Sequence, residues 1–294
     1  MSKNSSDKLL FSVIGYIFIF MIVTVCILPF ILIISGSFSN QDEILKYGYG
    51  LLPRKFTTTA YQVAFEKPQA TINAYLITGI TTVTGSALGL FITSMTGYVL
   101  SRKDFEWRNR FSFFFYFTTL FSGGLVSWYI LIMKYLKLGD SFLVLVLPTV
   151  LNVFYIIIMK SFMSTIPSAI TESAKIDGAN DFKIFIKLIL PLSKPALASI
   201  GLFIALGYWN DWFLSYMFIQ NDNLFTLQFY LYKIVAGADA LAKLSFVPGR
   251  DSSAIPTETL KLAMTVIATG PIVLLYPFVQ KYFVSGLTIG SVKG

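Results

Sequence analysis

Histidine is absent from this 294-residue sequence, and cysteine occurs once, as Cys26. The missing histidines exclude His-based catalysis and His-ligated metal sites, and a lone cysteine excludes an internal disulfide. Charged residues make up 13% of the chain, about half the share found in soluble domains. Since hydrophobic residues reach 55%, the composition excludes a soluble globular enzyme, a disordered tail and a disulfide scaffold. It indicates a protein of the lipid bilayer.

The charge balance is basic, with 23 Lys and Arg against 15 Asp and Glu and a net charge of +8. In a membrane protein, a basic excess is typical of cytoplasmic loops that face anionic lipid headgroups. We therefore expect a lipid bilayer and no nucleic acid among the partners.

Six apolar segments reach the roughly 20 residues that a membrane-spanning helix needs. They are continuously apolar, whereas strands of a membrane barrel alternate apolar and polar residues. The first segment is about twice as long as the core of a signal peptide and has no A-x-A cleavage site, so we expect a retained helix. The sequence predicts an all-α, polytopic bundle that forms one domain over residues 1–294. Its predicted spans are 9–34, 73–100, 111–133, 142–159, 195–219 and 262–280.

The basic loops indicate how the chain is oriented. Six spans put both termini on one side, and with the termini inside, the inner segments carry 13 basic residues and the outer ones 10. The densest basic cluster, Arg102 to Arg110, then falls in a short inner loop, and short loops determine orientation most strongly. We therefore expect cytoplasmic N- and C-termini.

The inner loop over residues 160–194 predicts two short helices separated by a sharp turn. Pro167 suits a first helical turn, and Gly178 permits a turn that a Cβ would resist. A second helix is expected from Asp181 to Leu190, ending at Pro191. Composition alone favours an interfacial helix lying on lipid over a projecting knob. The residues expected to cap the first helix are Ser164 or Thr165.

This loop resembles the EAA loop of ABC importer permeases. Glu172-Ser173-Ala174 is followed by three residues, Gly178, nine residues and then Leu188-Ile189-Leu190-Pro191; Ser173 and Leu188 depart from the family pattern. The likeness covers nearly the whole chain and is greatest to the carbohydrate branch, in particular its MalG-like second permease. Ser127 stands where that branch is expected to have proline. Further segments that resemble the branch are 176–179, 191–195, 122–125, 209–211, 227–228, 276–283 and 290–294.

The resemblance implies a six-helix permease bundle that moves a carbohydrate, and the details are typical of a group associated with oligosaccharides. The sequence has no G-x-x-x-x-G-K-[ST] phosphate loop. The chain is therefore expected to be no enzyme and to bind no cofactor, with ATP and Mg²⁺ held by a separate ATPase. The other implied partners are a second, homologous permease subunit, the ATPase as a dimer and an extracellular sugar-binding protein or lipoprotein. The implied location is the bacterial cell membrane.

By the same resemblance, part of the inner loop couples the permease to its ATPase, and the C-terminal tail over residues 282–294 docks between the paired ATPase subunits. The residues implied for coupling are Glu172, Ala174, Asp177, Gly178 and Ala179. Those implied for the tail are Gly286, Gly290, Lys293 and Gly294.

Asp211 is the one acidic residue inside a predicted span. A charge there is costly unless it faces water, a partner or the bundle interior. Aromatic and hydrogen-bonding neighbours suit the hydroxyls and apolar faces of a sugar, although Trp and Tyr also gather at membrane interfaces as anchors. Candidate pathway residues are Tyr208, Trp209, Asn210, Asp211 and Trp212, together with Asn152 in the fourth span. Gly85 and Gly89 form a G-x-x-x-G pattern, which predicts close helix packing.

Two other functions are alternatives to the permease. An ion-coupled secondary carrier would show broken helices, internal repeats and buried charges, and the sequence has no clear repeat. A membrane-embedded glycosyl or lipid transferase, with Asp211 as base or metal ligand, would need converging acidic groups within the membrane. The spans contain one such group, so the permease is the preferred interpretation.

Overall fold

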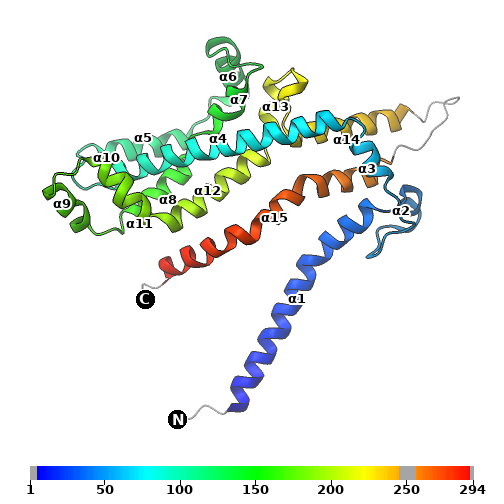
Figure 1. Ribbon diagram of the computed structural model, residues 1–294, viewed down its shortest axis with the longest axis horizontal. Coiled ribbons are helices and arrows are strands. Elements are labelled where there is room, and N and C mark those ends of the chain that lie inside the picture. Colours follow the sequence, from blue (N-terminus) through cyan, green and yellow to red (C-terminus); the bar gives the residue numbers. More distant parts are fainter. Residues whose placement is uncertain (1–4, 245–255, 292–294) are drawn as a thin grey trace. The chain divides into compact units, whose positions relative to one another are not determined.

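The computed structural model of the chain describes residues 5–244 and 256–291, which fold largely into helices (Figure 1). Within those ranges there is no β-strand, and an isolated bridge joins Ser39 to Phe56. The prediction of an all-α fold is therefore confirmed. The contacts divide the chain into two units, residues 1–68 with 231–271 and residues 69–230 with 272–294.

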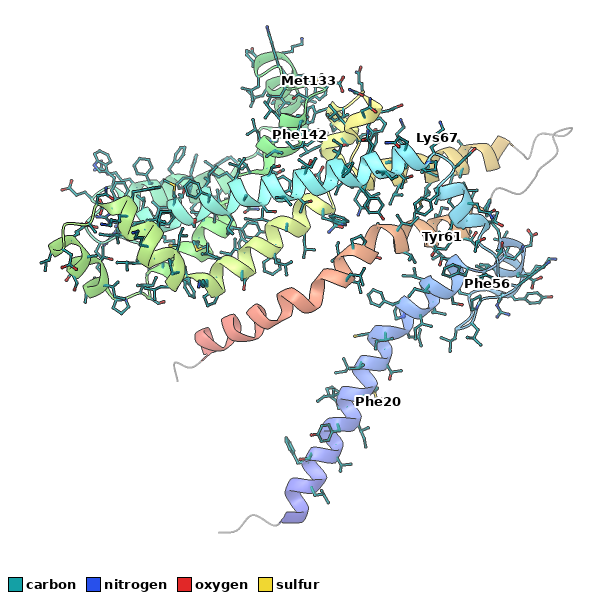
Figure 2. All side chains as sticks on the ribbon, viewed as in Figure 1. Phe20, Phe56, Tyr61, Lys67, Met133 and Phe142 are labelled. Carbon is teal, nitrogen blue, oxygen red and sulfur yellow. The ribbon has the colours of Figure 1, made fainter. Side chains whose placement is uncertain are left out.

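The first unit contains the long N-terminal helix α1 (Ser5–Ser37). Most of its described side chains are exposed, among them Phe20 at 73% (Figure 2), as expected for a helix that faces lipid. Asn40 caps the next helix, α2 (Gln41–Tyr47), by accepting a hydrogen bond from the backbone of Asp42 at 3.0 Å. The unit also holds α3 (Thr59–Ala64) and parts of α14 (Leu227–Leu244) and α15 (Thr257–Ser291). The expected single domain over the whole chain stays a prediction.

The second unit contains α4 (Pro68–Ser101), a helix of 34 residues. Its other helices are shorter, and two of them continue into a π-helical turn. In chain order they are α5 (Arg108–Leu120), α6 (Gly124–Ile130), the π-helix η1 (Leu131–Tyr135), α7 (Phe142–Val146), the 3₁₀-helix η2 (Leu147–Thr149), α8 (Val153–Met163), α9 (Ser168–Ile176), α10 (Asp181–Ile184), the π-helix η3 (Phe185–Ile189), α11 (Leu190–Leu192), α12 (Lys194–Trp209), α13 (Phe213–Phe218), and the 3₁₀-helix η4 (Asp222–Leu224).

Long apolar helices account for three of the six predicted spans. α1, α4 and the first part of α15 each contain at least 18 residues of membrane-spanning composition. The predicted spans 9–34 and 73–100 lie inside α1 and α4, and 262–280 lies inside α15.

Each of the other three predicted spans contains a break between shorter helices, and the count of six spans stays a prediction. Span 111–133 bends by 112° between α5 and α6, where Gly124 takes a φ of +79°. Span 142–159 bends by 52° before α8, and Asn152 at this break accepts the N–H of the second residue of α8 at 2.9 Å. Span 195–219 is divided between α12 and α13. A polar side chain can interrupt a helix because it accepts the hydrogen bond of a backbone N–H, and glycine can do so because it adopts a positive φ.

Close helix packing at the G-x-x-x-G pattern is confirmed. A Cβ on Gly85 would overlap the ring of Tyr208 in α12, and one on Gly89 would lie 3.0 Å from the carbonyl oxygen of Val150. The absence of side chains at these two positions lets α4 approach its neighbours closely.

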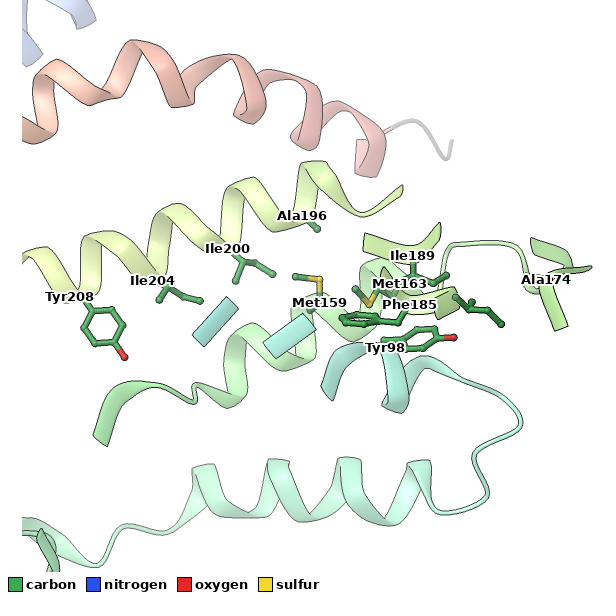
Figure 3. Packing of buried hydrophobic residues seen from close by; sticks show 11 residues of the cluster. Tyr98, Met159, Met163, Ala174, Phe185, Ile189, Ala196, Ile200, Ile204 and Tyr208 are labelled. Atoms are coloured by element: carbon green, nitrogen blue, oxygen red, sulfur yellow. The ribbon is translucent and has the colours of Figure 1, made fainter. Parts of the chain in front are cut away.

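A buried apolar cluster joins α4, α8, α12 and the segment from α9 to η3 (Figure 3). The rings of Tyr98 and Phe185 stack within it, with centroids 5.4 Å apart. Ala174 is its member from α9, so the inner loop is packed onto the helices. The buried members are Tyr98, Met159, Met163, Ala174, Ile184, Phe185, Ile189, Ala196, Ile200, Ile204 and Tyr208.

Candidate functional site

The turn between α9 and α10 is held by backbone hydrogen bonds; we call residues 168–184 the elbow. The N–H of Ala179 donates to the carbonyl oxygen of Ala174 at 2.9 Å, and that of Gly178 donates to Lys175 at 3.0 Å. These two bonds form a Schellman motif. Gly178 takes a φ of +75°, which residues with a Cβ rarely adopt. Asn180 then caps α10 by accepting the N–H of its third residue at 2.8 Å. The predicted sharp turn at Gly178 is confirmed.

The elbow buries a small side chain and exposes larger ones. Ala174 is 8% exposed, whereas Ile176 is 87% exposed. Glu172 and Asp177 are exposed too. The ion pairs among the described residues do not include Glu172. Exposed carboxylates beside an exposed apolar side chain give this face the character of a docking surface.

A network of four charged residues connects the elbow with the end of α4; we call it the charge network. The guanidinium of Arg102 makes a bidentate contact with the carboxylate of Asp104, and its Nη1 lies 2.5 Å from Oδ1 of Asp181. Nζ of Lys175 in α9 lies 2.8 Å from Oδ2 of Asp104 and 3.9 Å from Oδ1 of Asp181. Each cation therefore contacts both carboxylates.

The charge network shifts the pKa values of Asp104 and Arg102. Hydrogen bonds from Arg102 and then from Lys175 hold the pKa of the Asp104 carboxyl well below its usual range. The hydrogen bond to Asp104 in turn raises the pKa of Arg102. Both charges are therefore retained throughout the physiological pH range.

Two details of the predicted inner loop were wrong. Ser164 and Thr165 do not cap α9, because their hydroxyls donate to carbonyl oxygens of α8, at 2.8 and 2.7 Å; Pro167 occupies the cap position. The second helix does not end at Pro191 but continues to Leu192. The wider π-turn of η3 precedes the proline, whose missing N–H and bulky ring a regular α-helix would not accommodate.

Five of the six predicted pathway residues, at positions 208–212, follow one another through the break between α12 and α13. A carboxylate oxygen of Asp211 accepts the N–H of Leu214 at 3.0 Å, and the Asp211 carbonyl oxygen accepts the hydroxyl of Thr226 at 3.0 Å. The amide oxygen of Asn210 accepts from the side chain of Gln228 at 3.4 Å. Residues 226–228 therefore hold this break in place. Asp211 was expected inside an apolar span and instead lies in the break, two residues before α13.

The aromatic side chains of this group have different surroundings. Tyr208 is buried, and its hydroxyl donates to the carbonyl oxygen of Val146 at 2.8 Å. The ring of Trp209 lies against Tyr75, with centroids 6.5 Å apart. Trp212 is 42% exposed. The geometry thus gives Tyr208 a packing role and leaves Trp212 accessible.

The predicted tail residues are only partly described. Gly286 and Gly290 lie within α15, which continues to Ser291, whereas Lys293 and Gly294 lie outside the described residues. Residues 282–291 of the predicted tail are helical and continue α15, and docking of the tail stays a prediction.

The sequence interpretation missed Arg102, Asp104 and Asp181 as site residues. Arg102 was counted only as a basic residue of the 102–110 loop, and Asp181 only as the start of a helix. The available signal was the presence of both charge signs in two inner loops, which permits pairing between them. Spacing along the chain does not reveal it, because Asp104 and Lys175 are 71 residues apart.

Comparison with known proteins gives a consistent result. Residues 85–289 match the family model described as "Binding-protein-dependent transport system inner membrane component". The chain is 40% identical to the polygalacturonan/rhamnogalacturonan transport system permease protein YtcP of Bacillus subtilis, over 97% of this chain and 99% of that protein. It is 28% identical to the arabinooligosaccharides transport system permease protein AraQ of Halalkalibacterium halodurans, over 96% and 95% of the two chains.

A solved structure is similar as well. A chain of a bacterial ABC transporter involved in the import of the acidic polysaccharide alginate superposes with a TM-score of 0.77 at 29% sequence identity. The match covers 96% of this chain and 99% of that one.

Proposed function

Because the chain belongs to the family of binding-protein-dependent transport system inner membrane components, we propose that it is the permease subunit through which an ATP-driven importer moves an oligosaccharide. A second, homologous permease subunit completes the pathway, and an extracellular sugar-binding protein delivers the substrate. ATP and Mg²⁺ are bound and used by a separate ATPase dimer, and this chain contributes no catalytic residue.

The observation that carries this proposal is the elbow. Its backbone is fixed by the Schellman motif and the Asn180 cap, and it presents Glu172, Ile176 and Asp177 to solvent. A rigid projection with an apolar tip and free carboxylates is suited to insertion into a cleft of a partner protein. We assign ATPase coupling to this surface, with Ala174, Gly178 and Ala179 keeping its shape.

The substrate pathway is proposed to include the break between α12 and α13. Asn210 and Trp212 are exposed there, and an amide beside an indole ring matches the hydroxyls and apolar faces of a sugar. Relatives named for polygalacturonan and arabinooligosaccharide transport support a saccharide as substrate. Asn152, at another break, is a weaker candidate.

The proposed orientation has both termini in the cytoplasm, which puts the elbow and the basic loop after α4 on the side where ATP is available. The preference of basic loops for the inner side supports this orientation. The C-terminal residues from Gly286 to Gly294 are then on the same side and able to contact the ATPase.

The test is gentle extraction of the tagged chain from native membranes, followed by identification of what co-purifies and by an ATP hydrolysis assay. Recovery of an ATPase and a second permease, with hydrolysis stimulated by a sugar-loaded binding protein, is the expected result. Recovery of the chain alone under several mild detergents, without hydrolysis, would contradict the proposal.

A further inference from the structure

The charge network lies next to the apolar cluster that packs the end of α4 against the elbow, and two pockets border it. A pocket of about 360 Å³ lies on one side of it and includes Phe105 and Phe182 in its lining. A second pocket, of about 480 Å³, lies on the other side and reaches Glu172 in α9. Arg102 and Asp104 line both pockets. The charged groups therefore add a polar connection between the loop after α4 and the elbow, beside the apolar contact of Tyr98 with Phe185.

Arg102 lies where its side chain contacts both the loop after α4 and the elbow. It follows directly on the last residue of α4, its side chain is 15% exposed, and its guanidinium lies 5.7 Å from the ring centre of Tyr98 in the same helix. The planar fork donates to Asp104 on one edge and to Asp181 on another. A lysine supplies one ammonium group and cannot reproduce this fork.

α4 connects this network with the proposed substrate pathway. Thr78 of α4 accepts the N–H of Leu227 at 2.7 Å, next to the residues that hold the break between α12 and α13. Thr78 and Ser101 are 23 residues apart in one helix, roughly 35 Å at 1.5 Å per residue. α4 therefore extends without interruption from the charge network to its contact with Leu227.

We infer that Arg102 is a positioning residue that ties the elbow to α4 through Asp104, Asp181 and Lys175, so that movement of the elbow is passed along α4 to the break at residues 210–212. This inference rests on the proposed function and goes beyond it, because none of the coupling residues implied by the family resemblance belongs to the charge network. Glu172 and its neighbours bind the ATPase, and Arg102 determines how much of the resulting movement reaches the pathway.

The test uses the full transporter, reconstituted in vesicles with its binding protein, and compares wild type with Arg102→Gln and Lys175→Gln. Three quantities are measured: the amount of ATPase that co-purifies, the rate of ATP hydrolysis and the sugar taken up per ATP hydrolysed. We expect unchanged ATPase recovery and a roughly fivefold lower uptake per ATP for Arg102→Gln, since a partly exposed network is weakened and not abolished. Lys175→Gln, which removes a more exposed cation, should act in the same direction.

Arg110→Gln and Lys187→Gln are matched controls. Each removes one positive charge from the same two loops, and neither residue belongs to the charge network. Arg102→Lys should restore uptake per ATP only in part. Wild-type uptake per ATP in both network variants, or loss of the ATPase from them, would overturn the inference. Failure of the wild type itself to recover an ATPase would instead contradict the proposed function.

Discussion

The ring of Tyr208 lies directly against Gly85, and its hydroxyl donates to the carbonyl oxygen of Val146 at 2.8 Å. A single aromatic residue of α12 thus contacts α4 and the end of α7 at a point where a Cβ on Gly85 would not fit. This contact explains why Tyr208, although next to Trp209 in sequence, serves packing.

Replacing Gly85 with valine should destabilise the chain by about 1–3 kcal/mol, because the added methyl groups force Tyr208 out of its position. Thermal unfolding in detergent measures the effect as a lower Tm. Gly79→Ala is the control, since a Cβ on Gly79 meets no atom within 4 Å. An unchanged Tm for Gly85→Val would show that α4 and α12 are less closely packed than described.

Gly178→Ala should weaken coupling without creating a clash. No atom lies within 4 Å of a Cβ at this position, so the cost comes from the φ of +75° alone, about 1 kcal/mol or more. We expect faster amide hydrogen exchange over residues 174–180 and lower uptake per ATP, with normal membrane insertion. Gly207→Ala, in the interior of α12 and equally free of clashes, should leave both quantities unchanged. Normal exchange in Gly178→Ala would contradict the strained turn.

Glu172→Gln should reduce the amount of ATPase that co-purifies and leave the Tm unchanged. The side chain is exposed and belongs to none of the ion pairs of the described residues, so its removal costs little folding free energy. Glu106→Gln removes an exposed carboxylate from the neighbouring loop and serves as the control. Equal ATPase recovery in the two variants would remove Glu172 from the docking surface.

Two substitutions at Asp211 separate its charge from its hydrogen bond. Asn keeps an oxygen that accepts the N–H of Leu214, whereas Ala removes it and should cost about 1 kcal/mol at the start of α13. If the charge acts on the substrate, Asp211→Asn changes the apparent KM for sugar uptake at an unchanged Tm. If uptake by Asp211→Asn equals that of wild type, the residue is only a cap.

The charge network predicts a defined dependence on pH. Because the pKa of Asp104 is lowered by Arg102, its stabilising contribution is complete above the unfolded-state pKa of about 3.9 and is lost as the pH falls through the lowered value. The Tm difference between wild type and Asp104→Asn should therefore be constant from pH 8 to pH 5 and shrink below about pH 4. Asp104 is half exposed, so the difference corresponds to no more than about 1 kcal/mol. A difference that grows with acidity would contradict this assignment.

The sequence predicted well the features that depend on residues close together in the chain. Uninterrupted apolar composition predicted α1 and α4, and Gly178 between two polar-apolar helical segments predicted the turn of the elbow. Gly85 and Gly89 predicted the close approach of α4 to its neighbours.

The features that it missed depend on contacts between distant parts of the chain. The break before α13 needs Thr226 and Gln228 to hold Asp211 and Asn210, and an apolar count across residues 195–219 carries no sign of them. The charge network likewise joins loops that composition treats separately. Helix continuity in an apolar segment is therefore set by such partners as well as by hydropathy.

In the elbow, the groups that make the bend differ from the side chains that are exposed on its surface. Its bend is made by backbone groups, the glycine at position 178 and the Asn180 cap, with the small Ala174 buried beneath it. The side chains displayed at 172, 173 and 176 contribute nothing to that bend. Mutation can therefore change the exposed side chains one at a time while the bend keeps its shape, so the surface proposed to bind the ATPase can vary independently of the folding of the chain.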